Sequence, residues 1–133
     1  MLELTYGIFL VLHGLVHLFY FGQSQRFFEL QHGMIWPDNS WAFSKHLGVQ
    51  RTRVLASLLC LLAAVGFVTA GIVVFLDQSW WKAVVIGSAA FSSAVFVVFW
   101  DKRMEKLYDK GGIGILLNLA ILVALAVFDW PSI

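Results

Sequence analysis

Charged residues are scarce in this sequence. Of its 133 residues, 13% are Asp, Glu, Lys or Arg and 60% are hydrophobic, whereas soluble domains contain about 25% charged and about 45–50% apolar residues. A single domain of this length cannot bury so much apolar surface in its own core. We therefore exclude an ordinary soluble domain and expect much of the surface to contact lipid.

Two further absences exclude classes of function. Cys60 is the single cysteine, so the chain can form neither an internal disulfide nor a C-x-x-C redox motif. We interpret it as a small buried side chain. The formal net charge is +1 and no basic cluster is interleaved with aromatic residues, which argues against a nucleic-acid partner.

Proline is nearly absent, and both prolines, Pro37 and Pro131, lie outside four long apolar stretches. Each stretch is close to the roughly 20 residues that a helix needs to cross a bilayer, where the backbone must satisfy its own hydrogen bonds. No Lys or Arg precedes the first stretch and no A-x-A-like site follows it, so we expect a retained helix rather than a signal peptide. The sequence predicts an all-α integral membrane protein, an up-and-down four-helix bundle forming one domain (1–133), with spans at about 4–22, 54–76, 80–100 and 112–128.

Basic residues are distributed unevenly among the predicted connections. Cytoplasmic loops are enriched in Lys and Arg. Lys82 lies on one side of the predicted bundle, and the first and third connections on the other side carry Arg26, Lys45, Arg51, Arg53, Lys102, Arg103, Lys106 and Lys110. We therefore expect loops one and three in the cytoplasm and both termini outside the cell membrane.

The first connection is about thirty residues long, more than a simple link requires. A turn at 36–38, the capping residue types at 38–40 and the glycine at 48 predict a short helix at about 40–47. Its aromatic residues indicate that the loop lies in the cytoplasmic interface and covers that end of the bundle. The interfacial residues that we expect are Trp36, Trp41, His32 and His46.

Small residues spaced by four recur in the predicted helices. Such pairs indicate faces where two helices can approach closely, but they do not tell which helices meet. The pairs are Gly66 and Ala70, Ala83 and Gly87, Ser88 and Ser92, and Ala120 and Ala124.

The first apolar stretch contains two histidines, His13 and His17, four residues apart. This spacing puts both imidazoles on one face of a helix, with His13 near the bilayer centre and His17 roughly 6 Å nearer the cytoplasm. A polar side chain at this depth needs a partner and indicates a functional site. Tyr6, Leu10 and Tyr20 share the face, which we therefore expect to point into the bundle or a subunit interface.

Three polar side chains of the third and fourth stretches, Ser92, Ser93 and Asn118, fall at a similar depth. No Asp, Glu, Lys or Arg lies in this layer. The simplest interpretation is that His13 and His17 donate or accept hydrogen bonds across helices to these groups. Bonds of this kind are worth about 0.6–2 kcal/mol each.

Metal or haem binding by His13 and His17 is an alternative interpretation. Two imidazoles one turn apart can bind a metal, but zinc needs a third or fourth ligand, which Cys60, or His32 and His46, would have to supply. Haem iron in a membrane can take histidine ligands. Because both histidines share one helix face, haem would require one axial histidine with a weak second ligand, or a dimer.

A small proton-coupled transporter is a second alternative, with the histidine pair relaying protons. The chain lacks the membrane-embedded carboxylate on which transporters of the small multidrug type depend. A hydrolase that uses Ser92 or Ser93 with a histidine would lack an acid to orient the imidazole.

The segments HGLVHLFYFG (13–22) and GGIGILLNLAILVAL (111–125) resemble small four-helix bacterial membrane proteins of the DoxX-like type. The resemblance implies a four-helix membrane bundle associated with respiratory or redox membranes, and it assigns no catalytic residue. Our leading interpretation is a membrane protein without catalytic activity, a homo-oligomer or a subunit or accessory protein of a membrane complex. Its His13/His17 face would bind a partner helix or a small ligand.

Overall fold

The computed structural model describes residues 1–102 and 112–132, which form four helices and confirm the predicted all-helical class. The helices are α1 (Leu2–Gln25), α2 (Ser44–Phe75), α3 (Trp81–Val98) and α4 (Gly112–Ala126). By length and composition, α1, α2 and α3 could each cross a membrane.

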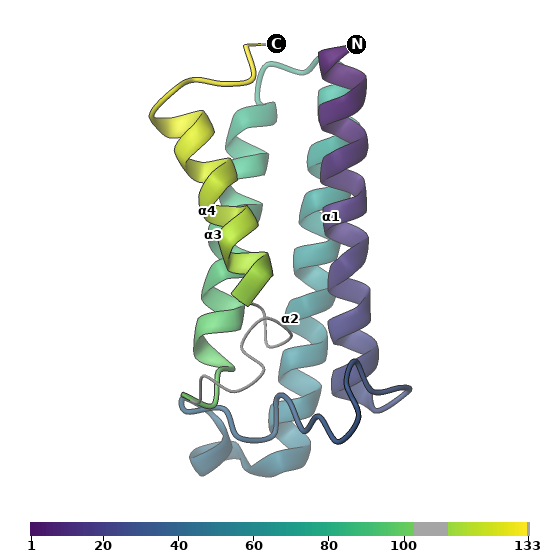
Figure 1. Cartoon of the computed structure of the whole chain (residues 1–133), viewed down its shortest axis with the longest axis vertical. Coiled ribbons are helices and arrows are strands. Elements are labelled where there is room, and N and C mark those ends of the chain that lie inside the picture. Colours follow the sequence, from purple (N-terminus) through teal and green to yellow (C-terminus); the bar gives the residue numbers. More distant parts are fainter. Residues whose placement is uncertain (103–111, 133) are drawn as a thin grey trace.

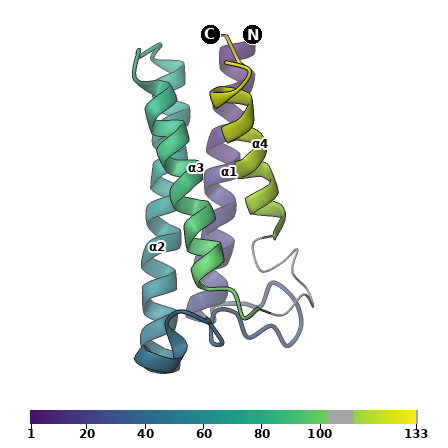
Figure 2. The ribbon, with the colours of Figure 1, turned by 90° about the vertical axis from the view of Figure 1, so that its left-hand side faces the viewer.

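The four helices lie side by side along the long axis of the molecule, and successive helices run in opposite directions (Figure 1). Both termini lie at one end, which we call the termini end, and the α1–α2 connection lies at the other, which we call the loop end. Helix α2 packs against α1 and α3, and α4 packs against α3. Figure 2, turned by 90°, shows that the helices run along the same axis from this side too.

Helix α1 extends beyond the predicted 4–22 at both ends. Its last turn is closed by Arg26, which adopts a left-handed conformation (φ 63°), and the Arg26 N–H donates to the carbonyl oxygens of Gln23 and Gly22. This geometry satisfies carbonyl groups that a helix otherwise leaves unpaired at its C-terminus.

Helix α2 begins at Ser44, well before the predicted start at 54. The expected separate helix at 40–47 is a single helical turn, Ser44–Leu47, which continues into α2 through Gly48 at φ 80°. Glycine reaches this left-handed conformation without steric cost, so the chain bends at Gly48 and resumes the helix.

Helix α4 ends at Ala126, before the predicted end at 128, and is shorter than the roughly 20 residues that span a bilayer. Asp129 adopts a positive φ and Pro131 follows it, and neither favours a continuing helix. Residues 103–111 of the third connection, including Arg103, Lys106 and Lys110, lie outside the described residues.

The backbones of α1 and α2 touch at glycines. A Cβ atom on Gly71 of α2 would lie 2.7 Å from the carbonyl oxygen of Gly7, and one on Gly14 of α1 would lie 3.0 Å from that of Ala64. Of the predicted small-residue positions, Gly66 approaches the Ser88 hydroxyl of α3. These contacts place α1 and α3 on different faces of α2, and the close approach of α1 to α2 sets which way α1 points its histidines.

Candidate functional site

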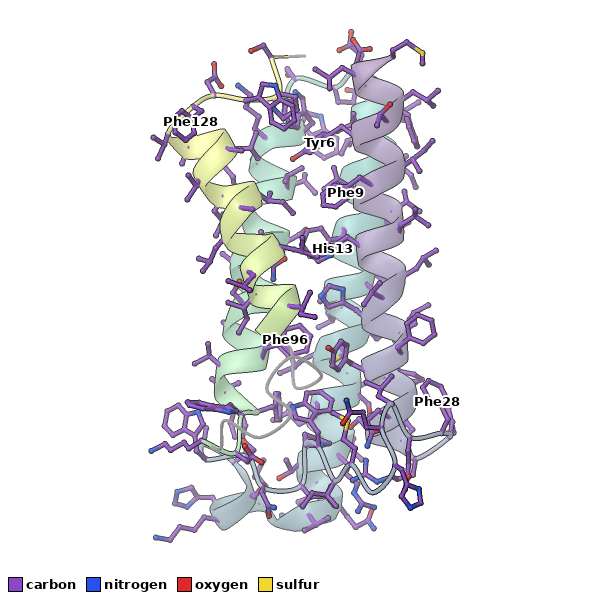
Figure 3. The ribbon with its side chains drawn as sticks, in the orientation of Figure 1. Tyr6, Phe9, His13, Phe28, Phe96 and Phe128 are labelled. Carbon is purple, nitrogen blue, oxygen red and sulfur yellow. The ribbon has the colours of Figure 1, made fainter. Side chains whose placement is uncertain are left out.

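The structure brings His13 and His17 of α1 together with Ser92 of α3 and Asn118 of α4. Their exposed fractions are 5%, 2%, 0% and 0%, respectively. His13 projects from α1 toward α3 and α4 at about half the height of the molecule (Figure 3). A polar layer from three helices therefore lies in the middle of an otherwise apolar interior.

Four hydrogen bonds connect these side chains. The Nε2 atom of His13 lies 2.8 Å from Oδ1 of Asn118, and the Asn118 Nδ2 group donates to Oγ of Ser92 at 3.0 Å. The Ser92 Oγ atom lies 2.6 Å from Nε2 of His17. The circuit closes within α1, where Nδ1 of His17 lies 2.9 Å from the carbonyl oxygen of His13.

One arrangement of protons satisfies all four bonds with neutral imidazoles. A carbonyl oxygen only accepts, so Nδ1 of His17 carries the proton, and Nε2 of the same ring accepts the Ser92 hydroxyl proton. The Ser92 oxygen must then accept from the amide nitrogen of Asn118. The Asn118 oxygen consequently faces His13, whose Nε2–H donates to it. All four bonds point in one direction around the circuit, an arrangement that strengthens each of them.

Aromatic rings enclose the polar layer. Phe67 of α2 contacts both imidazoles, edge to face with His13 at 4.6 Å and stacked with His17 at 5.4 Å between ring centroids. Phe9 stacks on His13, and Phe96 of α3 lies against His17. The sequence analysis did not single out Phe67, because nothing in its long apolar run distinguishes it from its neighbours.

Ser93 does not join this circuit. Its side chain is partly buried on α3, and its hydroxyl oxygen has no hydrogen-bond partner within the part of the chain that the structure describes. Depth in the bilayer, estimated from the sequence, did not distinguish Ser92 from Ser93. The rotation of α3 about its axis selects Ser92.

The residues proposed to complete a metal site lie elsewhere. Cys60 is fully buried in a separate apolar cluster with Tyr20 and Phe96, and His32 and His46 are exposed at the loop end. Among residues 1–102 and 112–132, no three His, Cys, Asp or Glu side chains are grouped so that they could hold a metal ion.

A hollow of about 380 Å³ lies between α1 and α4, on the termini side of His13. On α1 it is lined by Leu2, Thr5, Tyr6 and Phe9. Its other wall consists of Leu117, Ala120, Ile121, Ala124 and Trp130. Tyr6 and Phe9 project into the space between the helices, in the same direction as His13 (Figure 3). The predicted small pair Ala120 and Ala124 thus faces this hollow.

The loop end is held by ionic and backbone contacts that the sequence analysis missed. Asp38 accepts from Arg53 through both carboxylate oxygens, at 2.7 and 2.6 Å, and pairs with Arg26 at 3.0 Å. The buried Gln23 donates to the carbonyl oxygens of Met34 and Trp36. The loop is therefore tied to the C-terminus of α1 and the start of α2.

The two tryptophans expected at the membrane surface differ in environment. Trp36 is 4% exposed and packs against Tyr20, Phe96 and Phe99. Trp41 is 48% exposed, and its indole N–H donates to the Val97 carbonyl oxygen at 2.6 Å. Trp36 therefore serves as part of the core, whereas Trp41 remains accessible at the loop end.

Comparison of the chain with protein-family models, with curated proteins and with solved structures found no match. The resemblance to DoxX-like proteins stays a prediction. The polar layer and the hollow beside it are therefore the features of the molecule that bear on its function.

Proposed function

We propose that this chain is a small multi-pass membrane protein without catalytic activity of its own. It acts as a subunit or accessory protein, in a homo-oligomer or a larger membrane complex. The polar layer holds its helices together, and the adjoining hollow binds a small ligand. The outward surfaces of the three long helices support insertion in lipid, since many large apolar side chains on them are exposed, including Leu12, Val16, Leu58, Leu62 and Val97.

The observation that carries this proposal is the closed circuit of His13, Asn118, Ser92 and His17. A nucleophile or general base needs a free lone pair or proton that reaches a substrate. Both nitrogens of His17, Nε2 of His13 and the hydroxyl proton of Ser92 are instead committed to internal bonds. Nδ1 of His13 keeps a lone pair, but the circuit offers it no hydroxyl to activate, because the Ser92 proton is already held by His17. We therefore assign the layer a structural role and place ligand binding in the hollow.

Charge supports an orientation in the cell membrane with the loop end in the cytoplasm. Arg26, Arg53 and Lys102 belong to the loop end, whereas Lys82 lies at the termini end and pairs there with Asp129. In this arrangement all four helices cross the bilayer and both termini lie outside. Helix α4, the shortest, would be accommodated by local thinning of the bilayer.

Site-specific labelling tests the topology. Cys60 is fully buried, and replacing it by alanine gives a background without thiols. A cysteine at the exposed Gln50 should react with an impermeant reagent from the cytoplasmic side, and one at the exposed Gln78 from the outside. Labelling of both cysteines from the same side of the membrane would contradict the proposed orientation.

An optical spectrum and metal analysis of the purified protein separate the structural role from a metal or haem site. The expected result is no Soret band and no stoichiometric metal. A bound haem or metal that is lost in His13→Gln or His17→Gln, with the fold retained, would replace the proposed role by a redox or metal-binding function.

A further inference from the structure

We propose that the hollow between α1 and α4 holds one acyl chain of a phospholipid, from the leaflet at the termini end. This inference rests on the proposed function, because it requires that the chain lies in a bilayer. It goes further in naming the ligand as a hydrocarbon chain that is a stable part of the folded protein.

The direction of the hollow matches a lipid chain. Its lining begins at Leu2 and Trp130 at the termini end and continues to Phe9 and Leu117, beside the polar layer. From Leu2 to Phe9 the helix rises about 10 Å. The hollow therefore runs along the helices from the membrane surface toward the bilayer centre, as the chains of one leaflet do.

The chemistry of the walls also fits a hydrocarbon. None of the lining residues is charged, and the wall on α4 is formed by Leu117, Ile121 and two alanines. Leu117 is 39% exposed, so the hollow is open to the surroundings of the protein. Burial of apolar groups against such walls is favourable, and a charged or strongly polar ligand would lose its hydration without finding partners.

The polar end of the lipid has a place at the mouth of the hollow. Trp130 lines the mouth, and the Lys82–Asp129 ion pair lies next to it in an exposed position. Tryptophan and lysine are residues that favour the membrane–water interface. A phospholipid head at this level remains hydrated while one chain descends between the helices.

A hydrocarbon chain is thinner than a helix, which is about 10 Å wide with its side chains, and it can enter a hollow of about 380 Å³ between two helices. A second copy of the chain on this face is an outcome that the experiment below distinguishes.

A bound chain would support the polar layer. Phe9 and Leu117 form the inner end of the hollow, and each is adjacent to a member of the circuit: Phe9 stacks on His13, and Leu117 precedes Asn118. A chain packed against Phe9 and Leu117 would restrict both helices. The bond between His13 and Asn118 would then be most stable in the lipid-bound protein.

Native mass spectrometry of the protein, released from mixed micelles of phosphatidylcholine and detergent, tests the proposal. The wild-type protein should retain one phospholipid. Ala120→Phe fills the hollow and should reduce the lipid-bound fraction at least tenfold. Ala126→Phe is the matched control, because Ala126 is exposed on the same helix and does not line the hollow; it should retain the lipid. If Ala120→Phe fails to fold, Ala124→Leu makes the same test with a smaller side chain.

Each remaining outcome overturns the inference. Equal lipid retention in Ala120→Phe and Ala126→Phe would place the lipid elsewhere. A bound mass of a free fatty acid, or of another apolar molecule, would exclude a phospholipid. A lipid-free dimer that Ala120→Phe dissociates would assign the hollow to a second copy. A wild-type protein that stays in the membrane after carbonate washing but retains no lipid would refute this inference alone, whereas loss from the membrane would refute the proposed function.

Discussion

His13 and Asn118 lie 105 positions apart in the chain, and their side chains meet at 2.8 Å in the interior. This bond connects α1 directly with α4, which packs mainly on α3. On the other side of the carboxamide, Asn118 also donates to Ser92. One buried amide therefore joins α1, α3 and α4.

Replacing Asn118 by leucine should destabilise the protein. The substitution leaves the His13 N–H without an acceptor and removes a donor to Ser92, at a cost of about 1–3 kcal/mol in the free energy of unfolding. Leu119→Met, at the exposed neighbouring position, is the control and should change that free energy by less than about 0.5 kcal/mol. Reversible unfolding in mixed micelles measures both, and equal stabilities would contradict the role of the bond.

Glutamine should replace His17 better than leucine does. A glutamine amide has both a donor for the His13 carbonyl oxygen and an acceptor for the Ser92 hydroxyl, the two bonds that His17 makes. We expect a loss of about 1 kcal/mol for His17→Gln and about 2–3 kcal/mol for His17→Leu. Equal losses in unfolding measurements would show that ring packing, and not hydrogen bonding, determines the choice of histidine.

Asp38 should control the order of the first loop. Its carboxylate binds both Arg26 and Arg53. Asp38→Ala removes both carboxylate bonds of Arg53 and the ion pair of Arg26, which keeps its hydrogen bonds to loop carbonyl oxygens. Losing about 1.5 kcal/mol of local stability makes the opened loop about tenfold more populated. Trypsin, which cuts after Arg and Lys, should therefore cleave the loop about tenfold faster. Asn39→Ala, at the exposed adjacent position, is the control, and matching cleavage rates would argue against this role.

The four helices and the shared face of His13 and His17 could be predicted from the sequence. The presence and approximate position of each helix follow from the apolar runs, although α2 begins at Ser44 and not at 54. A spacing of four places two side chains on one face whatever the tertiary structure. Tyr6, Leu10 and Tyr20 are buried on that face with them. Depth along the helix also pointed to Asn118 and to the pair Ser92 and Ser93.

The choice of Ser92 over Ser93 and the presence of the hollow could not be predicted. Helices α3 and α4 are apolar on all sides, so their sequences do not show which face points inward. The hollow depends on the distance between α1 and α4, which results from the packing of α1 on α2 and of α4 on α3. The ion pairs of Asp38 were missed because loop contacts have no periodicity.

The contact between α1 and α2 provides the last prediction, since two glycines offer a matched pair. At Gly71 an added methyl group would lie 2.7 Å from the Gly7 carbonyl oxygen and 2.6 Å from the Val11 side chain. The backbone atom cannot move aside without separating the helices, so Gly71→Ala should cost about 1–3 kcal/mol in the free energy of unfolding.

At Gly87 of α3 an added methyl group would meet nothing within 4 Å among the described residues. Gly87→Ala should therefore be neutral or stabilise the helix by up to about 1 kcal/mol, because alanine favours a helix over glycine. Unfolding of both variants in the same micelles measures the difference. If Gly71→Ala were as stable as Gly87→Ala, the close approach of α1 and α2 would be refuted, and with it the packing that directs His13 and His17 inward.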